Sequence, residues 1–353
     1  MMNYNVVFQY RNLLIVFASF LLSVVLVWMP WEFIKPSAFL DLDVYRNKFT
    51  FETSVLIEKE INTLWGFFIN EGLWDVSIRY LSSVIGISLE SIFSFIAFFT
   101  IFIFCKYIAV RHGVIAIVFV LNPLVIDFAF SQIRMALAIS IFVIGVDVNK
   151  KYIKCFLFIL SCFVHTVLVL FIGVYLLCSS YFKSNKIRAL FLNSPVLFVF
   201  FVALSIFFVI GPMRVLILNY LGDRRGVYPA GGSTLLYASF WFVYAFVLVF
   251  ISVSKKFVNI DIMMSFIWVL VFLFATFFGM YGARFLSASY PFIVSSMLAL
   301  ISMEFKNVIY RRSVDGRLTV NVDNLMGVNV LLSASLLGVF AVYSLIQWRY
   351  WFI

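Results

Sequence analysis

The sequence predicts an all-α, polytopic integral membrane protein, a single domain over 1–353 that crosses the bilayer about eleven times. Of its 353 residues, 64% are hydrophobic and 12% are charged. Soluble domains carry about 25% charged and about 45–50% apolar residues, so this composition is typical of a membrane protein. Long runs such as 12–29 and 196–210 contain no charged residue, as a helix in hydrocarbon requires.

The net charge of +10 belongs to short loops between these apolar runs. Basic clusters that separate apolar runs mark cytoplasmic loops, so we expect the lipid bilayer, and no nucleic acid, as a partner. The clusters are Lys150-Lys151, Lys183 with Lys186 and Arg188, Lys255-Lys256, and Arg311-Arg312. The four cysteines lie in or beside apolar runs without C-x-x-C spacing, which indicates packing roles rather than disulfides or metal ligands.

Apolar length places the helices in order along the chain. The predicted helices cover 12–30, 90–105, 114–130, 133–148, 152–164, 165–177, 189–211, 235–254, 262–281, 285–303 and 325–346. The polar stretch 31–89 is the first extracytoplasmic loop, and its part 54–70 is predicted to lie on the membrane as an amphipathic helix. The stretch 212–234 is a second extracytoplasmic loop, the N-terminus is cytoplasmic and the C-terminus is outside. The first loop is mainly acidic, with Glu32, Asp41, Asp43, Glu52, Glu58, Glu60, Glu71 and Asp75 against Lys35, Arg46, Lys48, Lys59 and Arg79.

The position of His165 decides this topology. In a single tilted helix over 152–177 it would lie at mid-membrane, whereas between two short helices it would lie at an extracytoplasmic turn. A helix over 152–164 would span only about 20 Å of a hydrocarbon core of about 30 Å. With two segments, however, nine later Lys and Arg residues all lie on the cytoplasmic side, and with one segment all nine move outside. The distribution of positive charge therefore favours a break at His165.

Several positive residues then gather at the outer ends of short turns, against the general trend. They are Arg134, His165 and Arg284, joined by Arg214, Arg224 and Arg225 in the second outer loop. Arginine near hydrocarbon is costly and typically faces a cavity or a partner. Because its planar guanidinium binds phosphate oxygens in a bidentate manner, we predict an outer cavity for an anionic ligand, with a lipid-linked phosphate as the natural candidate.

Each of these residues also has a structural interpretation, which the sequence leaves open. Arg134 could extend its side chain to the membrane interface or form an ion pair with Asp127. Arg284 could serve only to set the membrane topology. A lone histidine such as His165 is often a hydrogen-bonded core residue. A binding site is favoured because all of these residues are predicted to lie on the same side of the membrane.

Two further charged motifs are equally open. Arg224-Arg225 beside Asp223 is typical of a solvated turn as well as of an anion site, and Asp41-x-Asp43 is common in polar loops. No carboxylate–histidine cluster has metal-ligand spacing, so we expect no metal. No Gly-rich phosphate loop is visible, and we expect no cofactor.

The segment 132–138, Gln-Ile-Arg-Met-Ala-Leu-Ala, resembles the EpsG/Wzy family of membrane polysaccharide polymerases. The resemblance extends in order over about 40 to 290, and each of its motifs is short. The chain departs from the family pattern at Met135, where a polar residue or glycine is common, and at Val164 before the histidine. The matching motifs are Asp43-Val44-Tyr45 with Phe49, Arg134-x-x-x-Ala138, Lys150-Lys151, His165-Thr166, and Arg284 with Tyr290.

This resemblance implies transfer of a glycan from undecaprenyl diphosphate onto another lipid-linked repeat unit, at the outer face of the bacterial cytoplasmic (inner) membrane. Donor and acceptor are then undecaprenyl-diphosphate-linked oligosaccharides, the product is O-antigen or a related surface polysaccharide, and a chain-length-regulating protein is an implied partner. Arginines stabilise the charge that develops on the leaving diphosphate. His165 suits the base that activates the acceptor hydroxyl, with Asp43 as the second choice. The implied catalytic residues are His165, Arg134, Arg284 and Asp43, and the implied substrate contacts are Arg214, Arg224, Arg225, Tyr45, Asp41 and Tyr290.

Two other functions remain open on the sequence. A glycan ligase or single-sugar transferase with a polyprenyl-linked donor predicts the same cationic cavity, and its product distinguishes it. A flippase or another transporter would place ionisable residues near the bilayer midplane and show internal repeats. The chain shows no clear repeat, and its ionisable residues gather toward one face, which favours the polymerase.

Overall fold

The computed structural model describes residues 4–34, 39–51, 63–221, 235–255, 259–278, 280, 282–311 and 324–352. All regular structure within these ranges is helical, as predicted. The chain forms two compact units. Unit 1 comprises 1–174, 212–229 and 348–353, and unit 2 comprises 175–211 and 230–347.

Unit 1 contains most of the residues that the sequence singled out. Its helices are α1 (Tyr4–Trp28), α2 (Trp31–Ile34), α3 (Leu40–Phe51), α5 (Leu64–Ile69), α6 (Gly72–Arg79), the π-helix η1 (Tyr80–Val84), α7 (Leu89–His112), the 3-10 helix η2 (Val114–Val120), α8 (Pro123–Ser131), α9 (Ile133–Asp147), α10 (Lys151–Val164) and α14 (Arg214–Leu221). The first part of α11 (Leu168–Lys183) and the end of α19 (Asn324–Phe352) also belong to it.

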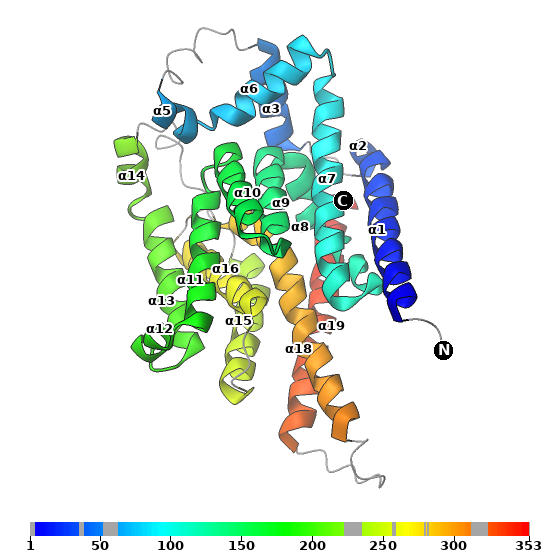
Figure 1. Ribbon diagram of the computed structural model, residues 1–353, viewed down its shortest axis with the longest axis vertical. Helices are drawn as coiled ribbons and strands as arrows, with labels where there is room; N and C mark the ends of the chain where they lie inside the picture. The colour runs from blue at the N-terminus through cyan, green and yellow to red at the C-terminus, as the bar shows by residue number, and fades with distance from the viewer. Residues whose placement is uncertain are drawn as a thin grey trace. The chain divides into compact units, whose positions relative to one another are not determined.

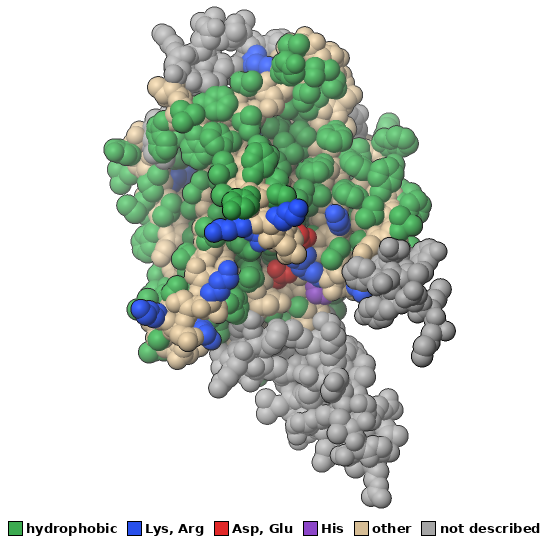
Figure 2. All heavy atoms as spheres, viewed as in Figure 1, with side chains coloured by type: hydrophobic (Ala, Val, Ile, Leu, Met, Phe, Trp, Pro, Cys, Tyr) green, Lys and Arg blue, Asp and Glu red, His purple; other side chains and the backbone are tan. Residues whose placement is uncertain are grey.

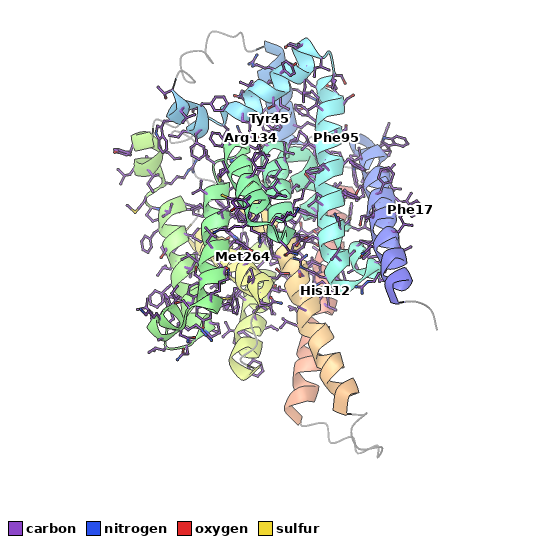
Figure 3. The ribbon with its side chains drawn as sticks, viewed as in Figure 1. Phe17, Tyr45, Phe95, His112, Arg134 and Met264 are labelled. Atoms are coloured by element: carbon purple, nitrogen blue, oxygen red, sulfur yellow. The ribbon has the colours of Figure 1, made fainter. Side chains whose placement is uncertain are left out.

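Small side chains allow α1 to pack along α7 in unit 1 (Figure 1). Ser19 and Ser23 of α1 are fully buried, and the Ser23 hydroxyl donates to the Ser19 carbonyl at 2.7 Å. Phe20 meets Phe98 of α7 edge to face, with ring centroids 5.5 Å apart. Phe17, labelled in Figure 3, is exposed, as expected for a helix with one side in lipid.

The α9–α10 hairpin forms the centre of unit 1. A Cβ on Gly145 would lie 2.8 Å from the Phe158 ring, so glycine is required where the two helices approach closely. At the hairpin end of α9, Arg111 of α7 pairs with Asp147 at 2.6 Å. The opposite end of α9, about 20 Å away at 1.5 Å per residue, carries Arg134.

Unit 2 is organised around the buried helix α16. Its helices are α12 (Asn185–Leu190), α13 (Pro195–Ile210), α15 (Leu235–Lys255), α16 (Ile260–Phe277), α17 (Ala283–Ala288) and α18 (Tyr290–Arg311), with the remaining parts of α11 and α19. The fully buried Tyr244 hydroxyl joins α15 to its neighbours, because it lies 2.6 Å from Ser265 Oγ of α16 and 2.5 Å from Ser296 Oγ of α18. In a lipid environment such hydroxyl hydrogen bonds hold helices together, because apolar side chains contact lipid tails as readily as they contact each other.

We expect Tyr244→Phe to lower the free energy of unfolding by about 1 kcal/mol, since one hydroxyl is lost while Ser265 and Ser296 still pair at 3.1 Å. Thermal unfolding in detergent measures this difference. Tyr152→Phe, at an 89% exposed position, is the matched control and should leave the midpoint unchanged. Equal midpoints for both variants would contradict the stabilising role of the cluster.

Three of the described helices are long and apolar enough to cross a membrane: Arg11–Trp28 within α1, α7 and α16. Two bent pairs bring the total to five if each pair is one span, η2 with α8 at 69° and α13 with α14 at 58°. Figure 2 shows broad areas of hydrophobic side chains on the viewed face. These helices are compatible with a membrane protein.

Predicted and observed helices differ mainly where proline or a capping residue interrupts an apolar run. The predicted helix 114–130 is two helices, because Asn122 caps α8 and Pro123 starts it. The predicted helix 189–211 is likewise α12 and α13, separated at Leu192 and Asn193, which both have positive φ. The predicted helix 285–303 corresponds to α17 and α18. The break at His165 is confirmed, since α10 ends at Val164 and His165 is extended.

Candidate functional site

The predicted first loop is largely helical in its described part. Its helices α3, α5 and α6, together called the cap helices, lie beyond the ends of α9 and α10 (Figure 1). The predicted amphipathic helix over 54–70 corresponds to α5 from Leu64 onward, while 52–62 lies outside the described residues. In hydrocarbon the end of α10 would need such a cover, because its 14 residues rise only about 21 Å.

Glu71 stands at the turn between α5 and α6 and is 2% exposed. Its φ of 58° lies in the left-handed region, which costs a non-glycine residue about 1–3 kcal/mol. It occupies the N-cap position of α6 but makes no capping bond with its side chain. The next residue is held tightly as well, because a Cβ on Gly72 would lie 2.5 Å from the Phe67 ring. The turn therefore directs a carboxylate away from its own helix.

The Glu71 carboxylate joins the two residues that the sequence placed first in the predicted site. Its Oε2 lies 2.5 Å from Arg134 Nη1, and its Oε1 lies 2.5 Å from His165 Nδ1. The backbone N–H and the hydroxyl of Thr166 both donate to Oε1 at 3.3 Å. We call Glu71, Arg134, His165 and Thr166 the Glu71 cluster. The side chains of Arg134 and His165 are only 16% and 11% exposed.

Helix ends explain why the charges of the Glu71 cluster are placed together. Arg134 is the second residue of α9, where the helix dipole is positive and a lone cation is unfavourable. His165 caps the C-terminus of α10, where a positive imidazolium is favoured. The Glu71 carboxylate compensates the Arg134 cation and would also compensate a protonated His165. In a neutral imidazole whose proton sits on Nδ1, next to this carboxylate, Nε2 is the ring nitrogen that carries the lone pair.

Tyr45 of α3 connects the cap helices to the Glu71 cluster. The Arg134 guanidinium lies 5.7 Å from the centroid of the Tyr45 ring, and Figure 3 shows the two residues near the start of α9. The ring also contacts Trp74 of α6 at 5.8 Å and Phe93 of α7 at 6.4 Å. A cation over an aromatic face gains about 0.5–2 kcal/mol, so Tyr45 helps to fix the position of Arg134.

A buried ion pair holds α3 against α6 next to this cluster. Lys48 Nζ lies 2.6 and 2.7 Å from the two carboxylate oxygens of Asp75. The two side chains are 10% and 7% exposed. Because both charges are buried, each depends on the other for compensation.

The other predicted residues of the first loop have partners in that loop. Asp43 pairs with Arg46 one turn later at 3.2 Å and is half exposed, and Asp41 lies on the same helix. Asp43 is therefore in an ion pair with Arg46. Glu71, and not Asp43, joins Arg134 to His165, while Tyr45 contacts Arg134.

The remaining predicted residues lie elsewhere. Arg214 is the first residue of α14 in unit 1. Arg284 is exposed in α17 of unit 2, and Tyr290 is fully buried in unit 2 against Phe340 at 6.2 Å. Arg224 and Arg225 lie outside the described residues. The convergence of Arg134, His165 and Arg284 remains a prediction.

Glu71 is the residue of the candidate site that the sequence did not single out, because it was one of eight acids in a polar loop. A local signal was present, because Glu71 comes two residues after the uncharged, apolar helix α5 (Leu64–Ile69). Within the described residues, no three His, Cys, Asp or Glu side chains are grouped as metal ligands would be.

Comparison with known proteins assigns no family to the chain. No family model matches it, and no curated protein and no solved structure is significantly similar.

Proposed function

We propose that this chain is a membrane glycosyltransferase that polymerises undecaprenyl-diphosphate-linked oligosaccharide repeat units at the outer face of the bacterial cytoplasmic membrane. The observation that carries the proposal is the Glu71 cluster, in which one buried carboxylate joins the Arg134 and His165 of the resembling motifs. Histidine, oriented by a carboxylate, is the usual arrangement for general-base chemistry near neutral pH.

In the proposed reaction His165 removes the proton of the acceptor hydroxyl. The acceptor oxygen forms a bond to the anomeric carbon of the donor glycan, and the bond from that carbon to the diphosphate oxygen breaks. The electron pair leaves with the lipid diphosphate, and the proton resides on His165 Nε2. Glu71 acts as a positioning residue, because its carboxylate lies 2.5 Å from Nδ1, where it orients the ring and stabilises the imidazolium that forms.

Arg134 is proposed to stabilise the negative charge that develops on the leaving diphosphate. Its guanidinium has five N–H donors in a planar fork, of which the contact to Glu71 uses one side. Ionic hydrogen bonds aimed at developing charge are among the largest contributions to catalysis. That Arg284 and the arginines of the second outer loop also bind the diphosphate stays a prediction from the sequence.

The proposed topology has eleven membrane-crossing helices and a cytoplasmic N-terminus. It is supported by the separation of charge along unit 1. Lys150, Lys151 and the Arg111–Asp147 pair lie at one end of α9, and the Glu71 cluster lies at the other. If the lysine-rich end faces the cytoplasm, the Glu71 cluster faces outward.

Glycan chain length in cells tests the proposed function. We expect His165→Ala and Arg134→Ala to replace the ladder of long glycan chains by single repeat units, visible on electrophoresis of the surface glycan. If wild-type cells also carry only single repeat units, the chain is a ligase or a single-sugar transferase instead. Lys151→Ala, a cation at the opposite end of unit 1, is the control and should keep long chains. Long chains in both site variants would overturn the proposed roles.

A further inference from the structure

Thr166 is the member of the Glu71 cluster to which the proposed reaction gives no role. Its hydroxyl and its backbone N–H both donate to Glu71 Oε1 at 3.3 Å. His165 Nδ1 lies 2.5 Å from the same oxygen, whereas Arg134 contacts the other oxygen, Oε2. Thr166 therefore holds the half of the carboxylate that faces the imidazole.

The break between α10 and α11 explains why Thr166 is able to hold a carboxylate. α10 ends one residue before His165, which is extended with a φ of −150°. The chain then turns into α11, because the Leu168 N–H donates to the His165 carbonyl at 3.0 Å. The Thr166 N–H comes before this bond in the chain and donates to Glu71 instead. A peptide N–H close to hydrocarbon needs such an acceptor, so the break itself creates a place for the carboxylate.

Glu71 needs an anchor on this turn because it comes from a distant part of the chain. It lies 95 positions before Thr166, on a backbone in the left-handed region. The ion pair with Arg134 holds Oε2 and leaves the carboxylate able to rotate about that contact. Two hydrogen bonds from one residue to Oε1 remove this freedom, and bonds to an ionised acceptor are among the stronger ones.

We propose that Thr166 is a positioning residue, which anchors the Glu71 carboxylate so that it orients His165. This inference rests on the proposed function and adds a residue to its machinery. Because Thr166 follows His165 directly, the base and the anchor of its orienting carboxylate belong to the same turn. The hydroxyl is the part of the anchor that depends on the side chain, since the backbone N–H is kept by every residue except proline.

Three variants isolate the contribution of this hydroxyl. Thr166→Val removes it and keeps the shape, whereas Thr166→Ser retains it. Thr100→Val is the matched control, because Thr100 is fully buried in α7 and its hydroxyl donates to the Ile96 carbonyl at 2.9 Å. With purified protein and lipid-linked repeat units, we expect Thr166→Val to lower kcat about tenfold at unchanged KM. Thr166→Ser and Thr100→Val should stay within about twofold of wild type.

A double variant separates positioning through Glu71 from a structural role of the hydroxyl. Glu71→Gln removes the charged acceptor, so Thr166→Val added to Glu71→Gln should lower kcat by less than about twofold more. A hydroxyl that only stabilised the turn would cost the same factor in both backgrounds.

The imidazole itself gives a readout that does not require activity. The chain has two histidines, His112 and His165, so ¹⁵N NMR of histidine-labelled protein in detergent resolves the ring of His165 beside one internal reference. A carboxylate held at Nδ1 favours the neutral tautomer with its proton on that nitrogen. We expect the fraction of this tautomer at His165 to fall in Thr166→Val and to be kept in Thr166→Ser, while the His112 signals stay unchanged.

Wild-type kcat and a wild-type tautomer fraction in Thr166→Val would overturn the positioning role, and so would an equal loss in Thr166→Ser. The proposed function would still stand in that case, provided His165→Ala cells lose long glycan chains. Long chains in His165→Ala cells would instead overturn the proposed function, and the role of Thr166 in the reaction with it.

Discussion

If the chain elongates glycan as proposed, replacing Glu71 by glutamine is expected to lower the rate of elongation by about 10²–10⁴-fold. Glutamine has nearly the same shape but no charge, and either end of its amide can face His165. The imidazole then loses the negative charge beside Nδ1, and Arg134 at the α9 N-terminus loses its counter-charge. We expect the loss in kcat rather than in KM, measured with lipid-linked repeat units and purified protein.

Asp147→Asn is the matched control, because it removes a carboxylate from an arginine at the other end of α9 and should retain activity. A lone buried Arg134 also threatens folding, so the double variant Glu71→Gln/Arg134→Gln is needed as well. It removes both charges and should recover the unfolding midpoint without recovering activity. If Glu71→Gln elongates glycan at the wild-type rate, or if the double variant regains activity, Glu71 does not position His165.

The helices of this chain were predictable because hydrocarbon imposes one simple demand on sequence. Backbone groups must be paired within each segment, so an apolar run of sufficient length becomes a helix. The break at His165 was predictable from charge alone, because one additional crossing moves every later lysine and arginine to the other side. The prediction of one continuous helix over 114–130 was wrong, because the capping residue Asn122 starts a new helix within this apolar run.

Some residues of the candidate site were predictable from the sequence, and one central residue was not. Arg134, His165 and Tyr45 carry recognisable motifs, and the structure brings these three together. Glu71 was not predictable, because its burial depends on contacts with residues up to 95 positions away. In an acidic loop the sequence does not show which side chains are buried, so buried carboxylates such as Glu71 resemble their exposed neighbours.

Breaking the buried pair between α3 and α6 is the second large effect that we expect. Lys48→Met leaves the Asp75 carboxylate buried without its cation, which should lower the free energy of unfolding by about 3–5 kcal/mol. The double variant Lys48→Met/Asp75→Leu replaces the pair by apolar groups of similar volume and should restore most of that loss. Thermal unfolding midpoints in detergent provide the comparison.

The exposed pair at the other end of unit 1 supplies the control. Arg111→Met breaks a pair whose side chains are 27% and 40% exposed and should cost only about 0–1 kcal/mol. Elongation adds a second readout, because a loosened α3 carries Tyr45 away from Arg134. We therefore expect Lys48→Met to elongate poorly and the double variant to elongate better. A midpoint for Lys48→Met no lower than that of Arg111→Met would show that the cap helices are held by their aromatic contacts instead.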